Sequence, residues 1–270
     1  MKRYLLSVVM PVHRIDDRVF QVERIVKSIS GLPIQLVIVQ DNHYFKFDIL
    51  KHVRGLDSEQ ISVVAGEFGN PGSARNFGLK YTNGDWTAFW DSDDFPEVIE
   101  FLKMIDYAES KSVSVVAGFF DEIEEEITKE SSRLKYLPIF LRVQILLNPG
   151  LWRFGFKTDS IETIKFPELV MAEDQVFLMK RIQKVTDICL YPGMVYRYLT
   201  NSPNQLTSQP YNHLKIREAL EYIFNNRPER SSFFYQFLRV KLAFSLLKLS
   251  PSLPSMRFVA MGLLNMKKGV

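Results

Sequence analysis

Short, unbroken runs of apolar residues recur along the first half of the chain. They predict strands at Tyr4–Val12, Ile34–Gln40, Ile61–Ala65, Trp86–Trp90 and Val113–Phe120. Strands that are apolar on both sides suit the interior of a parallel sheet, which carries helices on both of its faces. The pattern therefore predicts a sheet that is buried on both sides.

Between these runs, apolar residues recur at helical spacing. They predict helices at Val19–Ile29, Phe45–Val53, Ala74–Tyr81 and Val98–Ala108. The regular alternation of strand and helix predicts an α/β fold, in which a mostly parallel sheet is flanked by helices.

The second half of the chain has a more helical pattern. Helices are predicted at 136–150, at Glu173–Lys184 and from Tyr211 to the end, with breaks at Arg227-Pro228 and Ser250–Pro254. The acidic stretch 121–130 predicts a solvated surface segment, and the polar stretch 201–210 predicts a loop. We expect a sheet-containing domain at residues 1–210 and a basic helical C-terminal extension at residues 211–270.

Composition narrows the class of protein. The chain has 270 residues, of which 46% are hydrophobic and 24% charged, as is typical of an ordered globular protein. Its single cysteine, Cys189, excludes an internal disulfide framework, and its four scattered histidines argue against a histidine-built metal site. The apolar run near the N-terminus is too short to span a membrane and lacks a cleavage site, so it predicts a strand and no signal peptide.

The net charge of +3 is unevenly distributed. Residues 211–270 carry ten Lys/Arg and three Asp/Glu, or +7, whereas residues 1–210 carry 24 and 28, or −4. This basic extension has two open interpretations: a helical cap on the core or on a second subunit, or a surface at 229–270 that docks on anionic lipid. The charge is too modest to indicate nucleic-acid binding.

Carboxylates gather where the predicted fourth strand ends. The segment AFWDSDDFP (88–96) closes an apolar run with three aspartates in four positions. Asp91 and Asp93 are two residues apart, so an extended backbone projects both to one side, about 6.5–7 Å apart at Cα. Such a pair favours a cation between the carboxylates, and oxygen ligands suit Mg²⁺ or Mn²⁺; the alternative is a solvated acidic turn. We expect the crowding to be relieved only when a cation and a ligand bind.

Two features adjoin this pair. Asp94 precedes Pro96, which marks a first helical turn, so we expect Asp94 to cap that helix. The stretch GNPGSARNFGLKYTNGD (69–85) places glycines before a helix that contains Arg75. Amides and a guanidinium at a helix start could receive a phosphate or a base edge. The alternative is a Gly/Pro turn that leads into a helix with an exposed arginine.

Several motifs occur in an order that is more specific than any one of them. They are SVVMPVHR (7–14), LVIVQDN (36–42), GSARNFGL (72–79), NGDWTAFWDSDD (83–94), FPELVMAEDQVF (166–177) and YRYLTNSPNQLTS (196–208). In this order they resemble the GT-A glycosyltransferases, specifically the large inverting family 2 of nucleotide-sugar transferases. The resemblance implies a GT-A type, Rossmann-like fold for residues 1–210.

The resemblance also implies roles for individual residues. Asp93 matches the metal-binding acid of the DxD motif, Asp91 is shared between the metal and the donor ribose, and Asp174 matches the general base of the ED motif. The positions implied in donor nucleotide binding are Pro11, Val12, His13, Asp41, Arg75 and Asp91. The positions implied on the acceptor side or in the closing loop are Trp152, Glu173, Arg197, Asn201 and Ser202.

The sequence departs from the family in two places. Gln40-Asp41-Asn42-His43 stands where the family commonly has an acidic pair followed by Gly-Ser, and His13-Arg14 stands where it favours Tyr-Asn. Both departures lie in the implied nucleoside pocket.

The activity that the resemblance implies is an inverting, metal-dependent glycosyl transfer. The donor is a nucleotide sugar, by family a UDP-sugar, and the acceptor is a hydroxyl of a glycan or of a lipid-linked molecule. The implied cofactor is Mn²⁺ or Mg²⁺, and the expected location is cytoplasmic, peripheral at the inner face of the membrane. A homo-oligomer is compatible with the sequence. The alternatives are a catalytically silent sugar- or nucleotide-binding module of the same fold and a GT-A-like nucleotidyltransferase.

Overall fold

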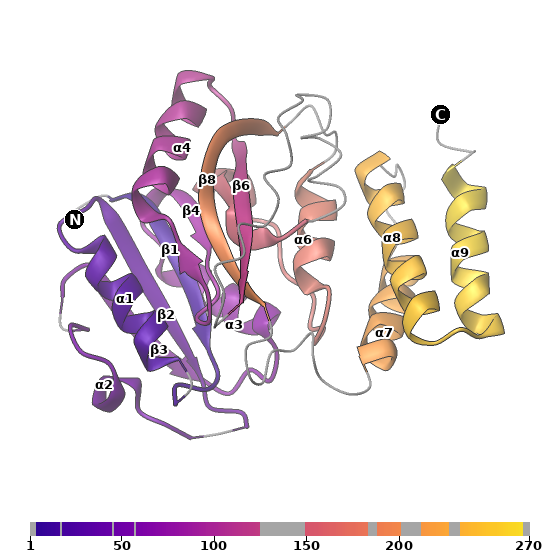
Figure 1. Ribbon diagram of the computed structural model, residues 1–270, viewed down its shortest axis with the longest axis horizontal. Coiled ribbons are helices and arrows are strands. Elements are labelled where there is room, and N and C mark those ends of the chain that lie inside the picture. The colour runs from indigo at the N-terminus through magenta and orange to yellow at the C-terminus, as the bar shows by residue number, and fades with distance from the viewer. Residues whose placement is uncertain are drawn as a thin grey trace.

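A mixed sheet forms the centre of the molecule (Figure 1). The computed structural model describes residues 4–16, 18–44, 46–56, 58–124, 149–182, 188–200, 212–226 and 233–266. The strands in these ranges are β1 Tyr4–Val12, β2 Ile34–Asp41, β3 Ile61–Gly66, β4 Gly84–Phe89, β5 Phe95–Pro96, β6 Val115–Glu124, β7 Phe154–Lys157 and β8 Cys189–Thr200. Their order across the sheet is β3-β2-β1-β4-β7-β6-β8-β5.

Most pairings in the sheet are parallel. β1 pairs in parallel with β2 and β4, β2 with β3, and β6 with β8. β7 is antiparallel to both β4 and β6, and the short β5 is antiparallel to β8. Because β1, β2 and β4 run in the same direction, the residues that follow them meet at one edge of the sheet.

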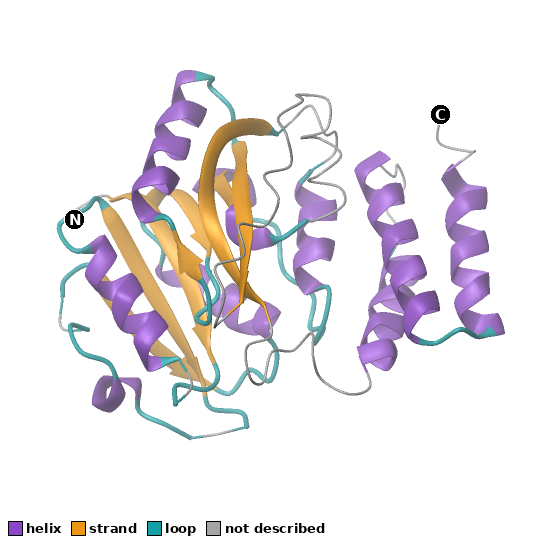
Figure 2. Cartoon of the chain, viewed as in Figure 1, coloured by secondary structure: helices purple, strands orange, loops and turns teal. Residues whose placement is uncertain are grey.

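Helices cover both faces of this sheet (Figure 2). The helices in the described ranges are α1 Val19–Ile29, α2 Ile49–His52, α3 Pro71–Gly78, α4 Val98–Ser110, α6 Glu173–Arg181, α7 Asn212–Asn225, α8 Phe233–Leu249 and α9 Leu253–Met266, of which the last three lie beyond α6. Alternate residues of β1 serve opposite faces: Val8 packs in one buried cluster with Ile25 of α1 and Phe101 of α4. Val9 packs in the other with Ala74 of α3 and Phe177 of α6. The predicted double burial is confirmed for β1, β2 and β4, whereas β3, at the edge of the sheet, is largely half-buried. The α/β fold class is confirmed.

One predicted helix is much shorter than expected. The apolar spacing predicts a helix over Phe45–Val53, but α2 covers Ile49–His52, and Asp48 caps it by accepting a hydrogen bond from the Leu50 amide at 3.1 Å. The buried Gln40 side chain bonds the backbone on both sides of this start, with Nε2 donating to the Phe47 carbonyl and Oε1 accepting from the Ile49 amide. This partner at the end of β2 holds the segment before Ile49 out of the helix.

Several other predictions concern boundaries. The acidic stretch 121–130 begins inside β6, which reaches Glu124, so its first residues belong to a strand, although Glu122 is exposed as predicted. The rest of that stretch, residues 136–148 of the predicted helix and the predicted loop at 201–210 lie outside the described residues. The helix predicted from Glu173 begins at that residue.

The helical extension packs beside α6 (Figure 1). Helix α8 contacts α6, and its Leu238, Leu242 and Leu246 are buried in the same cluster as Val176 and Phe177 of α6. Helices α7 and α9 pack in turn against α8. Within the described ranges, no helix is both long enough and apolar enough to cross a membrane.

Candidate active site

Eight of the predicted site residues line a cavity of about 260 Å³ at the carboxyl ends of β1 and β4. Pro11 and His13 line it from the end of β1, Arg75 from α3, and Asp91 and Asp93 from the turn after β4. Helix α6 adds Glu173 and Asp174, and Trp152 and Tyr198 complete the wall. The structure thus brings together acids that are 80 positions apart in the sequence.

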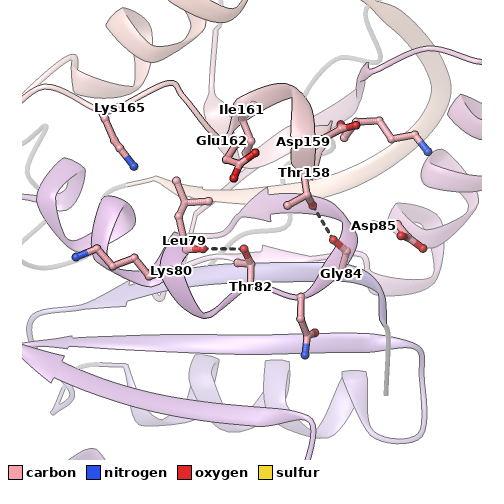
Figure 3. Close-up of a pocket in the computed structure, with 12 residues that line it drawn as sticks. Leu79, Lys80, Thr82, Gly84, Asp85, Thr158, Asp159, Ile161, Glu162 and Lys165 are labelled. Carbon is pink, nitrogen blue, oxygen red and sulfur yellow. Dashed lines mark hydrogen bonds between the residues drawn. The ribbon is translucent and has the colours of Figure 1, made fainter. Parts of the chain in front are cut away.

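A larger hollow lies at the opposite end of the sheet (Figure 3). It measures about 810 Å³ and begins at Gly84, the first residue of β4, beside the residues that follow β7. Its charged lining residues are Lys80, Lys157, Lys165, Asp85, Asp159 and Glu162. These charges balance, and none of the predicted site residues lies there. The smaller cavity is therefore the candidate active site.

Arg75 joins two walls of the cavity. Its Nη2 donates to Asp91 Oδ1 at 2.8 Å and its Nη1 donates to Glu173 Oε1 at 2.6 Å. Helix α3 can hold Arg75 there because Gly78 lets it approach the sheet closely; a Cβ at Gly78 would lie 2.5 Å from Val9 Cγ1. The two carboxylates raise the pKa of the buried guanidinium against the effect of its burial, so it is permanently charged.

A second arginine, Arg18, holds the other carboxylate. Its Nη2 lies 3.2 Å from Asp93 Oδ2, and its Nη1 donates to Ser92 Oγ at 3.1 Å. The same Nη1 is 3.4 Å from His13 Nδ1. Burial and the charge of Arg18 lower the pKa of His13 to about 4, so this ring is neutral at pH 7 and accepts from the guanidinium. Arg18 was not predicted as a site residue. The indication that the sequence offered was its position just before the first predicted helix.

These pairs correct one expectation. We expected the crowded carboxylates of Asp91 and Asp93 to be relieved only by a cation and a ligand. Instead each carboxylate has its own guanidinium, from Arg75 and Arg18 respectively. The site carries its own counter-charges because distant segments of the chain supply them.

Helix α6 presents its first two residues, Glu173 and Asp174, to the cavity. The preceding residue, Ala172, has the left-handed backbone conformation (φ 63°), which is uncommon for a residue with a side chain and turns the chain sharply into the helix. Asp174 Oδ1 accepts a hydrogen bond from the Gln175 amide at 2.7 Å. Burial raises the pKa of Asp174, whereas the charges of Arg75 and of Lys241 on α8 oppose that rise. Burial, with the neighbouring Asp174 charge, raises the pKa of Glu173 to about 7.

Asp94 does not cap a helix, and that prediction is wrong. Helix α4 begins only at Val98, and Pro96 belongs to β5, where it pairs with Tyr196 of β8. Asp94 is buried, and its Oδ1 accepts a hydrogen bond from the Leu199 amide at 2.8 Å. Burial and the charges of Asp93 and Asp91 raise the pKa of Asp94 well above its usual range. Asp94 thus fastens β8 to the turn that carries the two site carboxylates.

Three further predicted site residues do not line the cavity. Asp41 accepts backbone hydrogen bonds on both carboxylate oxygens, from His43 at 3.0 Å, Phe68 at 2.8 Å and Gly69 at 3.0 Å. Val12 directs its side chain into the buried core. Arg197 pairs with Glu97 across β8 and α4, with Nε 2.7 Å from Oε1. Asn201 and Ser202 lie outside the described residues.

A comparison of the sequence with protein families matches the region whose motifs build this cavity. The model of glycosyl transferase family 2 matches residues 7–181, which include every described lining residue named above except Tyr198. The chain belongs to this family. It is a nucleotide-sugar glycosyltransferase, as the order of its motifs indicated.

Individual relatives of this glycosyltransferase are distant. The uncharacterized glycosyltransferase EpsJ of Bacillus subtilis is 22% identical, over 82% of this chain and 70% of EpsJ. The poly(ribitol-phosphate) beta-N-acetylglucosaminyltransferase TarS of Staphylococcus aureus is 30% identical over 60% of this chain, a match that spans 29% of TarS.

Solved structures show the same fold. The structure of TarS residues 1–349 in complex with UDP-GlcNAc has a TM-score of 0.67 at 18% identity and covers 96% of this chain and 79% of that one. The mannosyltransferase PcManGT of Pyrobaculum calidifontis, in complex with GDP-Man and Mn²⁺, has a TM-score of 0.58 at 14% identity and covers 97% and 80%. These likenesses confirm the GT-A type fold.

The carboxylates of this glycosyltransferase fit a divalent cation that is bound in part by its substrate. In the described part of the chain, no three His, Cys, Asp or Glu side chains are grouped closely enough to form a complete metal cage. Asp91 and Asp93 nevertheless open into one cavity and offer oxygen ligands. Mg²⁺ and Mn²⁺ are typically held by one or two carboxylates, with waters and substrate phosphates completing the shell. These two carboxylates therefore match a cation whose other ligands are waters and the phosphate oxygens of a bound diphosphate.

An aromatic stack lies beside these carboxylates. Trp152 stacks on Tyr196, with ring centroids 4.5 Å apart, and on Tyr198 at 5.6 Å, while the edge of Phe120 meets it at 4.7 Å. Trp152 was predicted on the acceptor side, whereas Tyr198 was missed because its role depends on β8 lying beside the turn after β4. The Tyr196 hydroxyl accepts a hydrogen bond from the Asp91 amide at 3.0 Å, so the stack is attached to the carboxylate turn.

Proposed function

We propose that this glycosyltransferase transfers a sugar, with inversion, from a UDP-sugar to a hydroxyl group of a glycan or lipid-linked acceptor. Asp174 acts as the general base, Asp91 and Asp93 hold Mn²⁺ or Mg²⁺, and the nucleotide lies toward Pro11, His13 and Asp41. The observation that carries the proposal is that the carboxylate turn and the start of α6 line one cavity, where Arg75 bridges Asp91 and Glu173.

The chemistry of these residues suits a single displacement. As the acceptor oxygen bonds to the anomeric carbon, its proton passes to the Asp174 carboxylate, and the bond to the diphosphate breaks with its electron pair on the phosphate oxygen. A raised pKa makes Asp174 a stronger base than an exposed aspartate, provided that it is ionised. A bound divalent cation supplies positive charge for the leaving diphosphate.

The choice of donor rests on the relatives. TarS was solved with UDP-GlcNAc, and the more remote PcManGT with GDP-Man and Mn²⁺. UDP-GlcNAc is therefore the first donor to test. TarS is named for a poly(ribitol-phosphate) acceptor, which makes a hydroxyl-rich, phosphate-bearing polymer the first acceptor class to test.

Two isosteric variants separate the proposed roles. Asp93→Asn is expected to lose metal-dependent UDP-GlcNAc binding and turnover, because an amide replaces a charged ligand. Asp174→Asn is expected to keep donor binding and to lose about 10²–10⁴-fold in kcat, because the base is absent. Calorimetry with and without Mn²⁺ measures binding, and release of UDP measures turnover.

The exposed Asp106→Asn serves as the control for loss of one surface charge and is expected to behave as the wild type. Loss of donor binding in both site variants would contradict the separation of roles. Metal-dependent donor binding without turnover on any acceptor or on water would favour the silent binding module.

We also propose that residues 229–270 bind an anionic membrane surface near a lipid-linked acceptor. No acidic residue follows Glu229 in the sequence. The exposed apolar side chains of α8 and α9 include Phe244, Leu249, Met256, Met261 and Leu263. Apolar side chains among cations suit the interface of an anionic bilayer.

Vesicle sedimentation tests this contact. The protein is expected to sediment with phosphatidylserine vesicles but not with phosphatidylcholine vesicles. Arg257→Glu on α9 is expected to weaken that binding by at least about fivefold, since each cation near an anionic surface contributes about 1 kcal/mol. Arg54→Glu, an exposed site beyond α2, is the matched control. Equal sedimentation of both variants, or self-association in place of vesicle binding, would contradict the membrane contact.

A further inference from the structure

Arg18 is placed as a second cation in the cavity, and neither the motifs nor the proposed reaction assigns it a role. The residue lies just before α1, where its backbone amide donates to the Ile15 carbonyl at 2.8 Å and its carbonyl accepts from the Val22 amide at 2.9 Å. Its side chain is 7% exposed and lines the same cavity as Asp91 and Asp93. The backbone is thus fixed, and the guanidinium projects into the site.

The contacts of Arg18 differ from those of Arg75 in one respect. Arg75 binds two carboxylates, Asp91 and Glu173, from opposite walls. Arg18 binds one carboxylate, that of Asp93, at 3.2 Å. Its side chain also contacts Ser92 and His13, which are both neutral. A metal ion that displaces Arg18 from Asp93 therefore breaks one ion pair, whereas displacing Arg75 would break two.

Asp93 cannot serve two cations equally well. A divalent cation on Asp93 would meet the guanidinium at close range, and like charges in a partly buried cavity repel strongly. The guanidinium must then move away or gain an anionic partner. A diphosphate in the same cavity is such a partner, because guanidinium groups form forked hydrogen bonds with phosphate oxygens.

We propose that Arg18 is a resident counter-cation of Asp93, which competes with the divalent cation for that carboxylate until a donor diphosphate takes over the guanidinium. This rests on the metal site of the proposed function. It makes metal binding weak in the absence of donor and links the two ligands, so that each strengthens the binding of the other. A divalent cation therefore binds weakly at this site unless a donor diphosphate is also bound.

Mn²⁺ binding to the full chain tests the proposal directly, by electron paramagnetic resonance or calorimetry without any turnover. Arg18→Met is expected to lower the Kd for Mn²⁺ alone at least about fivefold, the lower end of typical coupling between sites. It is also expected to weaken UDP binding and to reduce the factor by which UDP tightens Mn²⁺ binding. Arg24→Met, which removes an exposed arginine from the same helix, is the control for net charge and is expected to bind Mn²⁺ as the wild type does.

Two further variants keep the test decisive. Ser92→Ala removes a group that holds the guanidinium, so it is expected to tighten Mn²⁺ binding in the same direction by a smaller factor, even where Arg18→Met folds poorly. Asp93→Asn is expected to abolish Mn²⁺ binding, which would show that the ion binds at Asp93. Equal Mn²⁺ affinity in the wild type, Arg18→Met and Ser92→Ala, with loss in Asp93→Asn, would overturn the role of Arg18 and leave the metal site standing. Absence of Mn²⁺ binding in all of them, with or without UDP, would overturn both.

Discussion

Several ionisable side chains of the cavity are buried close to one another. Arg75, Asp91, Glu173 and Asp174 come from three separate elements, and their pKa values respond to one another. A buried carboxyl that is easier to protonate in the folded than in the unfolded protein makes stability depend on pH. Glu173, whose pKa rises to about 7, is the group for which this dependence is clearest.

The sign of the effect follows from the direction of the shift. The folded state holds the Glu173 proton more tightly than the unfolded state, whose carboxyl titrates near 4.5. The contribution of Glu173 to stability is therefore fully present below about pH 4.5 and is lost as the pH rises toward about 7. Glu173→Gln cannot ionise, so it is expected to gain about 1–3 kcal/mol in free energy of unfolding relative to the wild type across that window.

Urea unfolding at pH 5, 6, 7 and 8 measures this difference. Glu162→Gln, which changes an exposed acid, is expected to follow the wild type at every pH. Parallel curves for Glu173→Gln and the wild type would show that the Glu173 carboxyl is ionised in the folded protein throughout the range.

The position of a residue in the cavity was predictable from the sequence where a motif carried it and not where a distant partner did. Asp91, Asp93 and Asp174 were found because their motifs follow a strand or start a helix. Arg18 was missed, and Asp94 was misinterpreted as a cap, because their partners are 74 or more positions away. Asp94 accepts its hydrogen bond from the Leu199 amide of β8, and helix α4 begins only at Val98, so a long-range contact decided the role of Asp94.

At the scale of elements, periodicity predicted most of the sheet well. The strands β1 to β4 lie where apolar runs indicated, because β1, β2 and β4 are buried on both faces of the sheet and apolar residues dominate all four sequences. The short strands β5 and β7 were missed, since two to four residues are too few for a period to show. Their pairing partners, not their own sequences, make them strands.

The contact between α6 and α8 brings the C-terminal extension to the helix that carries Asp174, the proposed base. Lys241 lies between the buried Leu238 and Leu242, and its charge lowers the pKa of Asp174. Burial lowers the pKa of Lys241 itself to about 8, partly offset by Asp174, so the ammonium is largely charged at pH 7. The groups that act on the Asp174 carboxyl thus include Arg75 and Asp91 as well as this lysine.

We expect Lys241→Met to shift the acidic limb of the pH profile of kcat/KM to higher pH by about half a unit. The reason is that Asp174 must be ionised to act as a base, and loss of a neighbouring cation raises its pKa. Lys248→Met, an exposed lysine on the same helix, provides the control. A profile that falls in height without moving along the pH axis would indicate a structural role for Lys241 alone.

At the scale of the whole molecule, the core does not stop where the charge pattern changes sign. One buried cluster contains Phe89 of β4, Phe177 of α6, Leu220 of α7 and Leu242 of α8. The sequence suggested a boundary near residue 210 because composition and charge change there, yet composition carries no information about which surfaces pack together. Apolar side chains on both sides of that position share one cluster, which predicts that they unfold together.

This prediction has a direct test because the tryptophans report one side of the boundary. Trp86, Trp90 and Trp152 all precede residue 210, whereas α7, α8 and α9 contribute helical circular dichroism. We expect fluorescence and far-ultraviolet dichroism to give one coincident transition. Leu242→Ala is expected to lower the free energy of unfolding by about 2–5 kcal/mol in both signals, since it leaves a cavity against α6. Phe244→Ala, at an exposed position two residues away, is expected to change it by about 0.5 kcal/mol or less. If Leu242→Ala shifted the dichroism alone and left the tryptophan transition unchanged, residues 211–270 would be a separate folding unit, and Lys241 would depend on docking between two domains to reach Asp174.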